Sequence, residues 1–283
     1  MRLFLAVIFA FAGLLSGRAT IHIVAAENFY GGVAQQIGGD QVQVTSILTN
    51  PDQDPHLFTV DPRTAAAVEQ ADIVVVSGID YDPWMADLVK AHPNPKRTVI
   101  TVADIIGAKE GENPHIWYKF GTMSQYSQIL TNALCRLDPD HASEYIKRFV
   151  DLGSELGKVS QRSTEMFGEV EGIDVLATEP VFGYMAHQLG LKMHGEEFQN
   201  HVMNNVEPTA QETEEFEDLL RQHKVKLLFY NSQASDPIAD RMKDIAKTAG
   251  IPVVGVTETE PANTTYVSWM LAQLDEVEKA LAK

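Results

Sequence analysis

The sequence predicts an α/β protein of two lobes, each a mainly parallel sheet flanked by helices, joined by one long rigid helix. Three observations lead to this prediction. In both halves of the chain, short apolar runs typical of buried strands alternate with helical segments, as in parallel sheets covered by helices. Between the halves lies a long stretch with helical spacing and no strand pattern. The length of 283 residues suits two domains at roughly 150 residues each.

The first 19 residues are typical of a cleavable secretory signal peptide. Arg2 supplies a positive start, residues 3–15 are apolar and uncharged, and residues 17–19 read Gly-Arg-Ala, which suits cleavage after Ala19. The apolar run is short for a membrane-spanning helix. No cysteine follows it at which a bacterial lipoprotein would be anchored. We therefore expect residues 1–19 to be removed on export to the periplasm.

Residues 20–123 are assigned to a first metal-binding lobe with four strands. The apolar or alternating runs that predict these strands are residues 21–26, 42–48, 72–78 and 99–102. Helices are expected between them, one over residues 27–38 and two more that open at Asp61-Pro62 and Asp82-Pro83. In the first of these pairs, Asp61 suits the N-cap and Pro62 suits the first helical position.

Residues 124–167 are assigned to the helical region that joins the lobes. A first helix is expected over residues 124–136. After an interruption at Asp138-Pro139, apolar residues recur at helical spacing to about Phe167. At about 1.5 Å per residue, this second helix is roughly 40 Å long, enough to run the height of a domain. Gly153 and Gly157 lie one turn apart on it and are interpreted as points of close packing.

Residues 168–283 are assigned to the second metal-binding lobe, which repeats the alternation. Strands are expected over residues 173–178, 225–230 and 251–256, and helices over residues 181–189, 209–223, 238–250 and 266–282. The adjacent residues Glu196 and Glu197 are interpreted as a solvated acidic turn.

Charge and cysteine content narrow the class of protein. The chain has 22 basic and 39 acidic residues, which argues against binding to nucleic acids or anionic membranes. Cys135 is the single cysteine, so no intramolecular disulfide can form. Because Cys135 lies in an apolar helical run, we expect a buried, inert thiol.

Two histidines occur in matching local sequences. Residues 54–58 read Asp-Pro-His-Leu-Phe and residues 113–117 read Asn-Pro-His-Ile-Trp. Proline disfavours helix in the residue before it, so both imidazoles are expected on extended or turning backbone, where sites are usually built. A lone loop histidine is more often a hydrogen-bonded surface residue than a ligand. Two in matched settings make His56 and His115 candidate metal ligands.

The second lobe offers oxygen ligands at equivalent strand ends. Glu179 directly follows the strand 173–178, and a polar stretch over residues 231–236 follows the strand 225–230. In parallel sheets, ligands bind beyond the carboxyl ends of the strands. These groups are therefore expected to face the two histidines across a cleft between the lobes.

At this point the sequence resembles a known family, the extracytoplasmic solute-binding receptors of ABC importers for zinc and manganese. The resemblance covers nearly all of the mature chain. It rests on the two Pro-His motifs, the long helix, residues 179–186 (Glu-Pro-Val-Phe-Gly-Tyr-Met-Ala) and residues 250–253 (Gly-Ile-Pro-Val). It implies one divalent metal ion held between two lobes, with His56, His115 and Glu179 as ligands. The His-rich loop of many zinc receptors is missing from this sequence.

The resemblance also implies an acidic fourth ligand after the strand 225–230, where Asp236 is the nearest candidate. Asn231, Gln233 or a water molecule are the alternatives. Asp236 followed by Pro237 is also what a helix N-cap looks like, so ligation and capping are both expected possibilities for this carboxylate.

The ligand types favour Mn²⁺ or Zn²⁺ as the bound ion. Two imidazoles with one or two carboxylates bind zinc tetrahedrally, and they suit manganese when a carboxylate chelates through both oxygens. Glu179 falls where zinc receptors often have histidine and manganese receptors have glutamate, which favours manganese slightly.

The function expected from the resemblance is that of a periplasmic, high-affinity receptor, not an enzyme. As a monomer it would capture Mn²⁺ or Zn²⁺ between its lobes and deliver the ion to the inner-membrane permease of an ABC importer. One alternative is a secreted metal-dependent hydrolase, although no His-Glu-x-x-His or Gly-x-Ser-x-Gly motif occurs. Another is a receptor of similar architecture for haem or a siderophore, which should have an aromatic or basic pocket.

Overall fold

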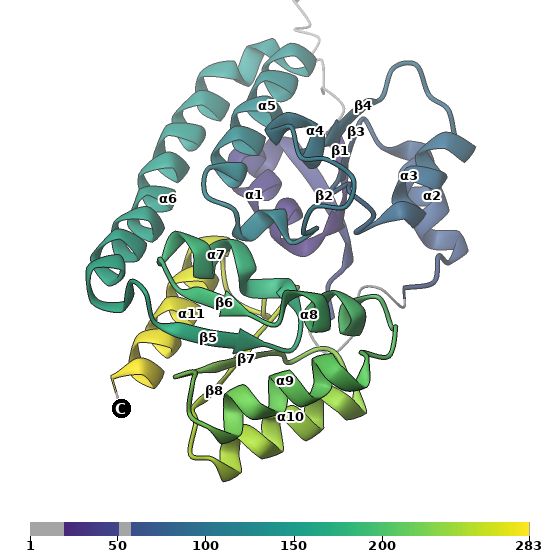
Figure 1. Cartoon of the computed structure of the whole chain (residues 1–283). Coiled ribbons are helices and arrows are strands. Elements are labelled where there is room, and N and C mark those ends of the chain that lie inside the picture. Colours follow the sequence, from purple (N-terminus) through teal and green to yellow (C-terminus); the bar gives the residue numbers. More distant parts are fainter. Residues whose placement is uncertain (1–19, 51–57, 283) are drawn as a thin grey trace, which may run out of the picture.

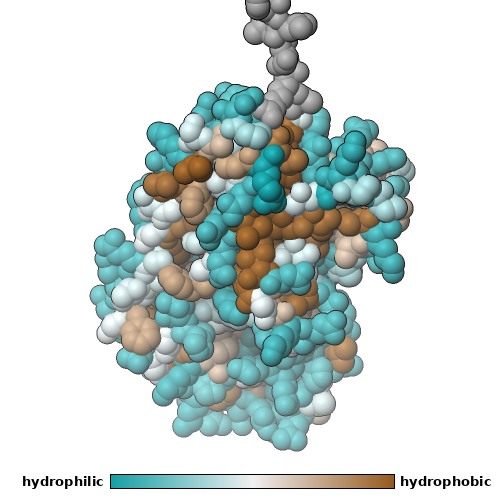
Figure 2. Space-filling view, turned by 90° about the horizontal axis from the view of Figure 1, so that it is seen from above, coloured by the Kyte–Doolittle hydropathy of each residue, from teal (hydrophilic) through white to brown (hydrophobic). Residues whose placement is uncertain are grey.

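The computed structural model of the protein describes residues 20–50 and 58–282. These residues form two lobes, with helix α6 running along one side of the molecule (Figure 1). Both lobes are α/β, as predicted. Among the described residues, no helix is long and apolar enough to cross a membrane. The face seen in Figure 2 is largely hydrophilic, with apolar residues gathered near its middle.

Each lobe contains a four-stranded parallel sheet with the same strand order. The strands of the first lobe are β1 (Ile21–Glu27), β2 (Val42–Leu48), β3 (Ile73–Val76) and β4 (Thr98–Thr101). Those of the second lobe are β5 (Asp174–Ala177), β6 (Lys192–His194), β7 (Leu228–Asn231) and β8 (Val253–Val256). The orders are β2-β1-β3-β4 and β6-β5-β7-β8. In each sheet the order in which strands are added switches from one side to the other at a single point, between β1 and β3 in the first lobe and between β5 and β7 in the second. Ligands of such sheets bind at these switch points.

Helices connect and cover the strands. In the first lobe they are α1 (Asn28–Gly38), η1 (Gly39–Gln41), α2 (Pro62–Gln70), α3 (Pro83–Ala91), α4 (Val102–Ile106) and η3 (Ile116–Tyr118). In the second lobe they are η5 (Pro180–Phe182), α7 (Gly183–Gln188), α8 (Glu196–Met203), α9 (Ala210–Arg221), α10 (Pro237–Thr248) and α11 (Tyr266–Leu281). The expected N-cap of α2 is confirmed, because the Asp61 carboxylate accepts the Thr64 N–H at 2.8 Å.

The helical region between the lobes consists of α5 (Thr122–Leu137), η4 (Pro139–His141) and α6 (Ala142–Val170). Helix α6 has 29 residues, which makes it about 43 Å long. It packs against α1 of the first lobe and against α11 of the second. The predicted linking helix is therefore present and is supported on both lobes.

Three sequence interpretations of local structure are wrong. Gly153 and Gly157 are not close-packing points, because a Cβ at either position would meet nothing within 4 Å. Glu196 and Glu197 open helix α8 instead of a turn, where two carboxylates interact favourably with the helix dipole. The short strand β6 was not predicted, since three residues carry too little periodicity.

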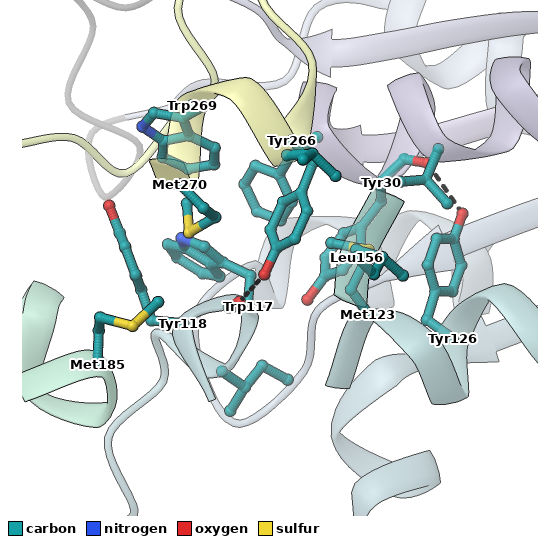
Figure 3. Close-up of a cluster of buried hydrophobic side chains, with 14 of the residues drawn as sticks. Tyr30, Trp117, Tyr118, Met123, Tyr126, Leu156, Met185, Tyr266, Trp269 and Met270 are labelled. Atoms are coloured by element: carbon teal, nitrogen blue, oxygen red, sulfur yellow. Dashed lines mark hydrogen bonds between the residues drawn. The ribbon is translucent and has the colours of Figure 1, made fainter. Parts of the chain in front are cut away.

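The lobes share one continuous apolar core. Phe29 of α1 packs on Trp117 of η3, with ring centroids 4.7 Å apart, and on Trp269 of α11 at 5.8 Å. The Tyr266 hydroxyl donates to the Trp117 carbonyl at 2.6 Å, as Figure 3 shows. Because buried rings and hydrogen bonds cross from one lobe to the other, large rotations of the lobes would break many contacts.

Candidate metal centre

His115 has a fixed orientation and tautomer. The Asn113 Oδ1 atom lies 3.0 Å from the His115 backbone nitrogen and 2.7 Å from the ring Nδ1. The Asn113 Nδ2 atom donates to the Pro180 carbonyl at 2.7 Å, which identifies Oδ1 as the acceptor. Nδ1 must therefore carry a ring proton, so in the neutral imidazole Nε2 carries the lone pair. In metal-binding histidines, the ring nitrogen that does not face the metal usually donates its N–H to a carbonyl or carboxylate oxygen, as Nδ1 does here.

The prepared Nε2 atom of His115 points at a carboxylate. His115 is fully buried, and Nε2 has no hydrogen-bond partner among the residues that the structure describes. It lies 3.4 Å from Oε2 of Glu258, which is also fully buried. Glu258 lies in the loop after β8 of the second lobe, so the pair spans the two lobes. Glu258 was not among the ligands predicted from the sequence.

Glu179 lies where the sequence predicted, just after β5, and it is 5% exposed. Asn231, the last residue of β7, connects it to Glu258. The Asn231 Nδ2 atom donates to Glu179 Oε2 at 3.1 Å and to Glu258 Oε1 at 2.5 Å. One neutral amide thus holds two buried carboxylates side by side at the carboxyl edge of the second sheet.

Two further side chains hold Glu258 in place. The Tyr81 hydroxyl of the first lobe donates to Glu258 Oε2 at 2.9 Å. The Gln233 Oε1 atom accepts the backbone N–H groups of Glu258 and Thr259, at 2.5 and 2.8 Å. Asn231 and Gln233, the sequence-based alternatives for the fourth ligand, therefore serve as hydrogen-bonding supports for the carboxylates in this structure.

Asp236 occupies the N-cap of α10. Its Oδ1 atom accepts the backbone N–H groups of Ile238 and Ala239, at 2.7 and 3.2 Å. Of the two roles expected for this carboxylate, the structure displays capping. In the described part of the chain, no hydrogen bond or ion pair joins Asp236 to His115, Glu179 or Glu258.

His56 lies outside the described residues, within 51–57, so the structure does not place it. The chain resumes at Phe58, whose ring packs on Trp84 of α3 at 4.4 Å between centroids. Within residues 20–50 and 58–282, no group of three or more His, Cys, Asp or Glu residues is arranged to hold a metal ion. The described residues thus supply one imidazole and two carboxylates. His115 faces Glu258, and Asn231 joins Glu258 to Glu179.

A signal for Glu258 was present in the sequence. Residues 256–260 read Val-Thr-Glu-Thr-Glu directly after the last predicted strand. Parallel strands end at one edge of a sheet, so the end of β8 is as good a position for a ligand as the ends of β5 and β7. Tyr81 could not have been found in this way, because its contact with Glu258 joins residues 177 positions apart.

An open groove of about 710 Å³ adjoins this centre. Asn113 and Pro180, which are hydrogen-bonded to each other, contribute to its wall, together with the exposed His187. His187 is exposed, and within residues 20–50 and 58–282 it makes no hydrogen bond or ion pair with His115.

Comparison with known proteins identifies relatives along nearly the whole chain. A family model described as "Zinc-uptake complex component A periplasmic" matches residues 23–280. The manganese ABC transporter substrate-binding lipoprotein PsaA of Streptococcus pneumoniae is 23% identical, over 100% of this chain and 98% of that protein. The manganese-binding lipoprotein MntA of Bacillus subtilis is 24% identical, over 81% of this chain and 77% of that protein.

Solved structures share the fold. The periplasmic zinc-binding protein TroA from Treponema pallidum superposes with a TM-score of 0.80 at 19% identity, covering 94% of this chain and 100% of that one. A crystal structure of ZnuA superposes with a TM-score of 0.74 at 22% identity, covering 93% of this chain and 98% of that one. The two-lobed architecture with one long linking helix is thus the architecture of these proteins.

Proposed function

Because this chain belongs to the family of periplasmic A components of zinc-uptake complexes, we propose that it captures Mn²⁺ or Zn²⁺ between its lobes for an ABC importer. The observation that carries the proposal is the His115 imidazole, whose Nδ1 is held by Asn113 and whose Nε2 faces the buried Glu258 of the other lobe at 3.4 Å. A neutral imidazole and a carboxylate from opposite lobes are suited to share one divalent cation.

The ligand set that we propose is His56, His115, Glu179 and Glu258. The first three are the residues expected from the sequence. Glu258 takes the place of Asp236, because the Asp236 carboxylate caps α10 whereas the Glu258 carboxylate is hydrogen-bonded to the same amide as Glu179. Nitrogen ligands would thus come from the first lobe and oxygen ligands from the second.

Two carboxylates and two imidazoles are compatible with either ion. Four single contacts at about 2.0–2.2 Å would suit tetrahedral Zn²⁺. Bidentate carboxylates would raise the coordination number and suit Mn²⁺, which prefers oxygen ligands more strongly than zinc does. For the ion to be bound, the Glu179 and Glu258 side chains would have to close on it, because the described side chains do not yet form a three-ligand group.

Metal content and competition test the proposal directly. Protein purified from periplasm without added metal should contain about one equivalent of Zn or Mn per chain by elemental analysis. Titration of the metal-free protein with each ion against a chelator indicator should give one tight site. Less than about 0.1 equivalent of metal, together with no detectable competition by either ion, would refute the proposal.

The two candidates for the fourth ligand make opposite predictions. Glu258→Gln keeps the shape of the side chain but weakens its oxygen as a ligand, so metal affinity should fall by at least about tenfold. Asp236→Ala removes a cap, so the free energy of unfolding should fall by about 1 kcal/mol while metal affinity stays within about twofold. Chelator competition and urea denaturation measure the two quantities. The reverse pattern would restore Asp236 as the ligand.

We further propose that the mature protein begins after Ala19, acts as a monomer and docks on an inner-membrane permease, with no catalytic step of its own. The groups that surround the site bind, orient and support ligands. No observation on the described residues favours either alternative function, the metal-dependent hydrolase or the haem or siderophore receptor. Most of the large aromatic side chains are buried in the core that the lobes share.

A further inference from the structure

A second pair of buried carboxyl groups, those of Glu27 and Asp82, lies next to Tyr81, which supports Glu258 in the metal centre. Glu27 is the last residue of β1, and Asp82 precedes α3. They are 0% and 1% exposed, and the Asp82 carboxyl group lies close enough to Glu27 to raise its pKa. The proposed metal ligands do not include either residue. Neither carboxyl caps the helix that follows it.

Two ionised carboxylates cannot be stable in this arrangement. Neither Glu27 nor Asp82 is ion-paired with a Lys, Arg or His side chain in the described part of the chain. Two negative charges in contact and out of water repel each other strongly, and such pairs hold one proton between them. As two carboxylates, the pair would contain no donor, and both Glu27 oxygens lack a hydrogen-bond partner. One proton placed between the groups removes both difficulties.

The surroundings assign the proton to Glu27. Asp82 accepts two backbone N–H groups, from Ser77 at 2.7 Å and from Gly78 at 2.8 Å, and these stabilise its charged form. Among the described residues, no backbone N–H of another residue donates a hydrogen bond to the Glu27 carboxyl group. Burial, and then the charge of Asp82, raise the pKa of Glu27 well above its usual range, whereas burial raises the pKa of Asp82 only to about 6. Glu27 is therefore the acid and Asp82 the carboxylate.

The Asp82 carboxylate stabilises a strained turn. Gly78, Ile79 and Asp80 have positive φ angles of 86°, 44° and 60°. For residues other than glycine this region is unfavourable, and it is least suited to a β-branched residue such as Ile79. The two hydrogen bonds from Ser77 and Gly78 to Asp82 close the turn across its base.

This turn delivers Tyr81 to the metal centre. Directly after the three strained residues, the Tyr81 ring packs on Trp117 at 4.7 Å and its hydroxyl donates to Glu258 Oε2. We propose that Glu27, held as a carboxylic acid that donates to Asp82, is a positioning residue that keeps Tyr81 against Glu258. This inference rests on the proposed function, because it assigns Glu27 an effect on the binding of the metal ion.

A double-mutant cycle tests whether Glu27 acts through Tyr81. Glu27→Ala and Tyr81→Phe should each lower Zn²⁺ or Mn²⁺ affinity, by up to about tenfold, as the loss of outer supports of a metal site does. In the Tyr81→Phe background, Glu27→Ala should have no further effect on affinity. Glu27→Gln should rescue binding to within about twofold, because its amide N–H can also donate to Asp82. Additive effects, or a Glu27→Gln variant as weak as Glu27→Ala, would overturn the proposal.

Infrared spectroscopy tests the protonation of Glu27 without metal. At about pH 9, where Glu260 with its pKa of about 7 is ionised, the metal-free wild type should still show the C=O stretch of a protonated, water-excluded carboxylic acid, and Glu27→Gln should lack it. Absence of this band from the wild type would overturn the proposal even if Glu27→Ala fails to fold. If the band is present but the wild type binds neither ion, then the proposed function fails while the acid–carboxylate pair stands.

Discussion

Replacing His115 with alanine is expected to lower the affinity for Zn²⁺ and Mn²⁺ by at least about 100-fold. This is more than the 10- to 100-fold that the loss of an outer support usually costs, because the variant removes a ligand. The expectation follows from the geometry of the side chain. Asn113 fixes the Nδ1–H tautomer, and Nε2 is buried, directed at Glu258 and without a hydrogen-bond partner within residues 20–50 and 58–282. Chelator competition on metal-free protein measures the effect.

His187→Ala is the matched control for His115→Ala. His187 lies on α7, is exposed and lines the groove next to the centre, so it shares the residue type and the neighbourhood but none of the contacts. Its replacement should leave affinity within about twofold. A loss of less than about threefold for His115→Ala, with the fold intact by circular dichroism, would remove His115 from the ligand set and with it the main support of the proposed function.

Acidification is expected to release the metal ion. Histidine ligands must be neutral to coordinate, so protons compete with the metal as the pH falls through the range in which imidazole titrates. With two imidazole ligands, the affinity should fall by at least about tenfold between pH 7 and pH 5. Calorimetric or chelator titrations at pH 7, 6 and 5 measure this. An affinity that is unchanged over the range would exclude histidine ligation.

Release by acid can be separated from unfolding by acid. Burial raises the pKa of Glu260 to about 7 and that of Asp82 to about 6. A carboxyl group whose pKa is raised in the folded state binds its proton more tightly there than in the unfolded chain. Its contribution to stability is therefore present at low pH and lost as the pH rises through that range. As the pH falls from 7 to 5, protonation of these two groups therefore increases the free energy of unfolding. The metal should leave over this range while the far-UV circular dichroism is unchanged.

The contacts between the two lobes indicate how this receptor would work. Tyr81 and His115 of one lobe already touch Glu258 of the other, at 2.9 and 3.4 Å. The ion would thus enter a centre whose two halves are in contact, and the adjustment that it requires is a movement of side chains and of short loops. Helix α6, packed on both lobes, and the Tyr266–Trp117 hydrogen bond oppose any wide opening.

Local patterns in the sequence predicted most of the architecture and part of the centre. The strand at 42–48 and the cap at Asp61 are as predicted, since periodicity and capping depend on neighbouring residues. His115 and Glu179 were recognisable because each directly follows a local signal, a Pro-His motif or an apolar strand. Asp236 was ambiguous for the same reason. An Asp-Pro pair after a strand is compatible with both a ligand and an N-cap, and only the direction of the backbone decides between them.

The sequence by itself determined two parallel α/β lobes, a linking helix of the right length and the two Pro-His segments whose histidines we propose as nitrogen ligands. The tertiary structure alone decided which acidic residue meets His115, because Glu258 and His115 are brought together by the packing of two lobes whose contacts span more than a hundred residues. It also decided that Glu27 is buried against Asp82, where water cannot solvate two charges. Strand and helix patterns arise from neighbours along the chain, whereas a binding centre arises from the convergence of distant strand ends, which no local pattern specifies.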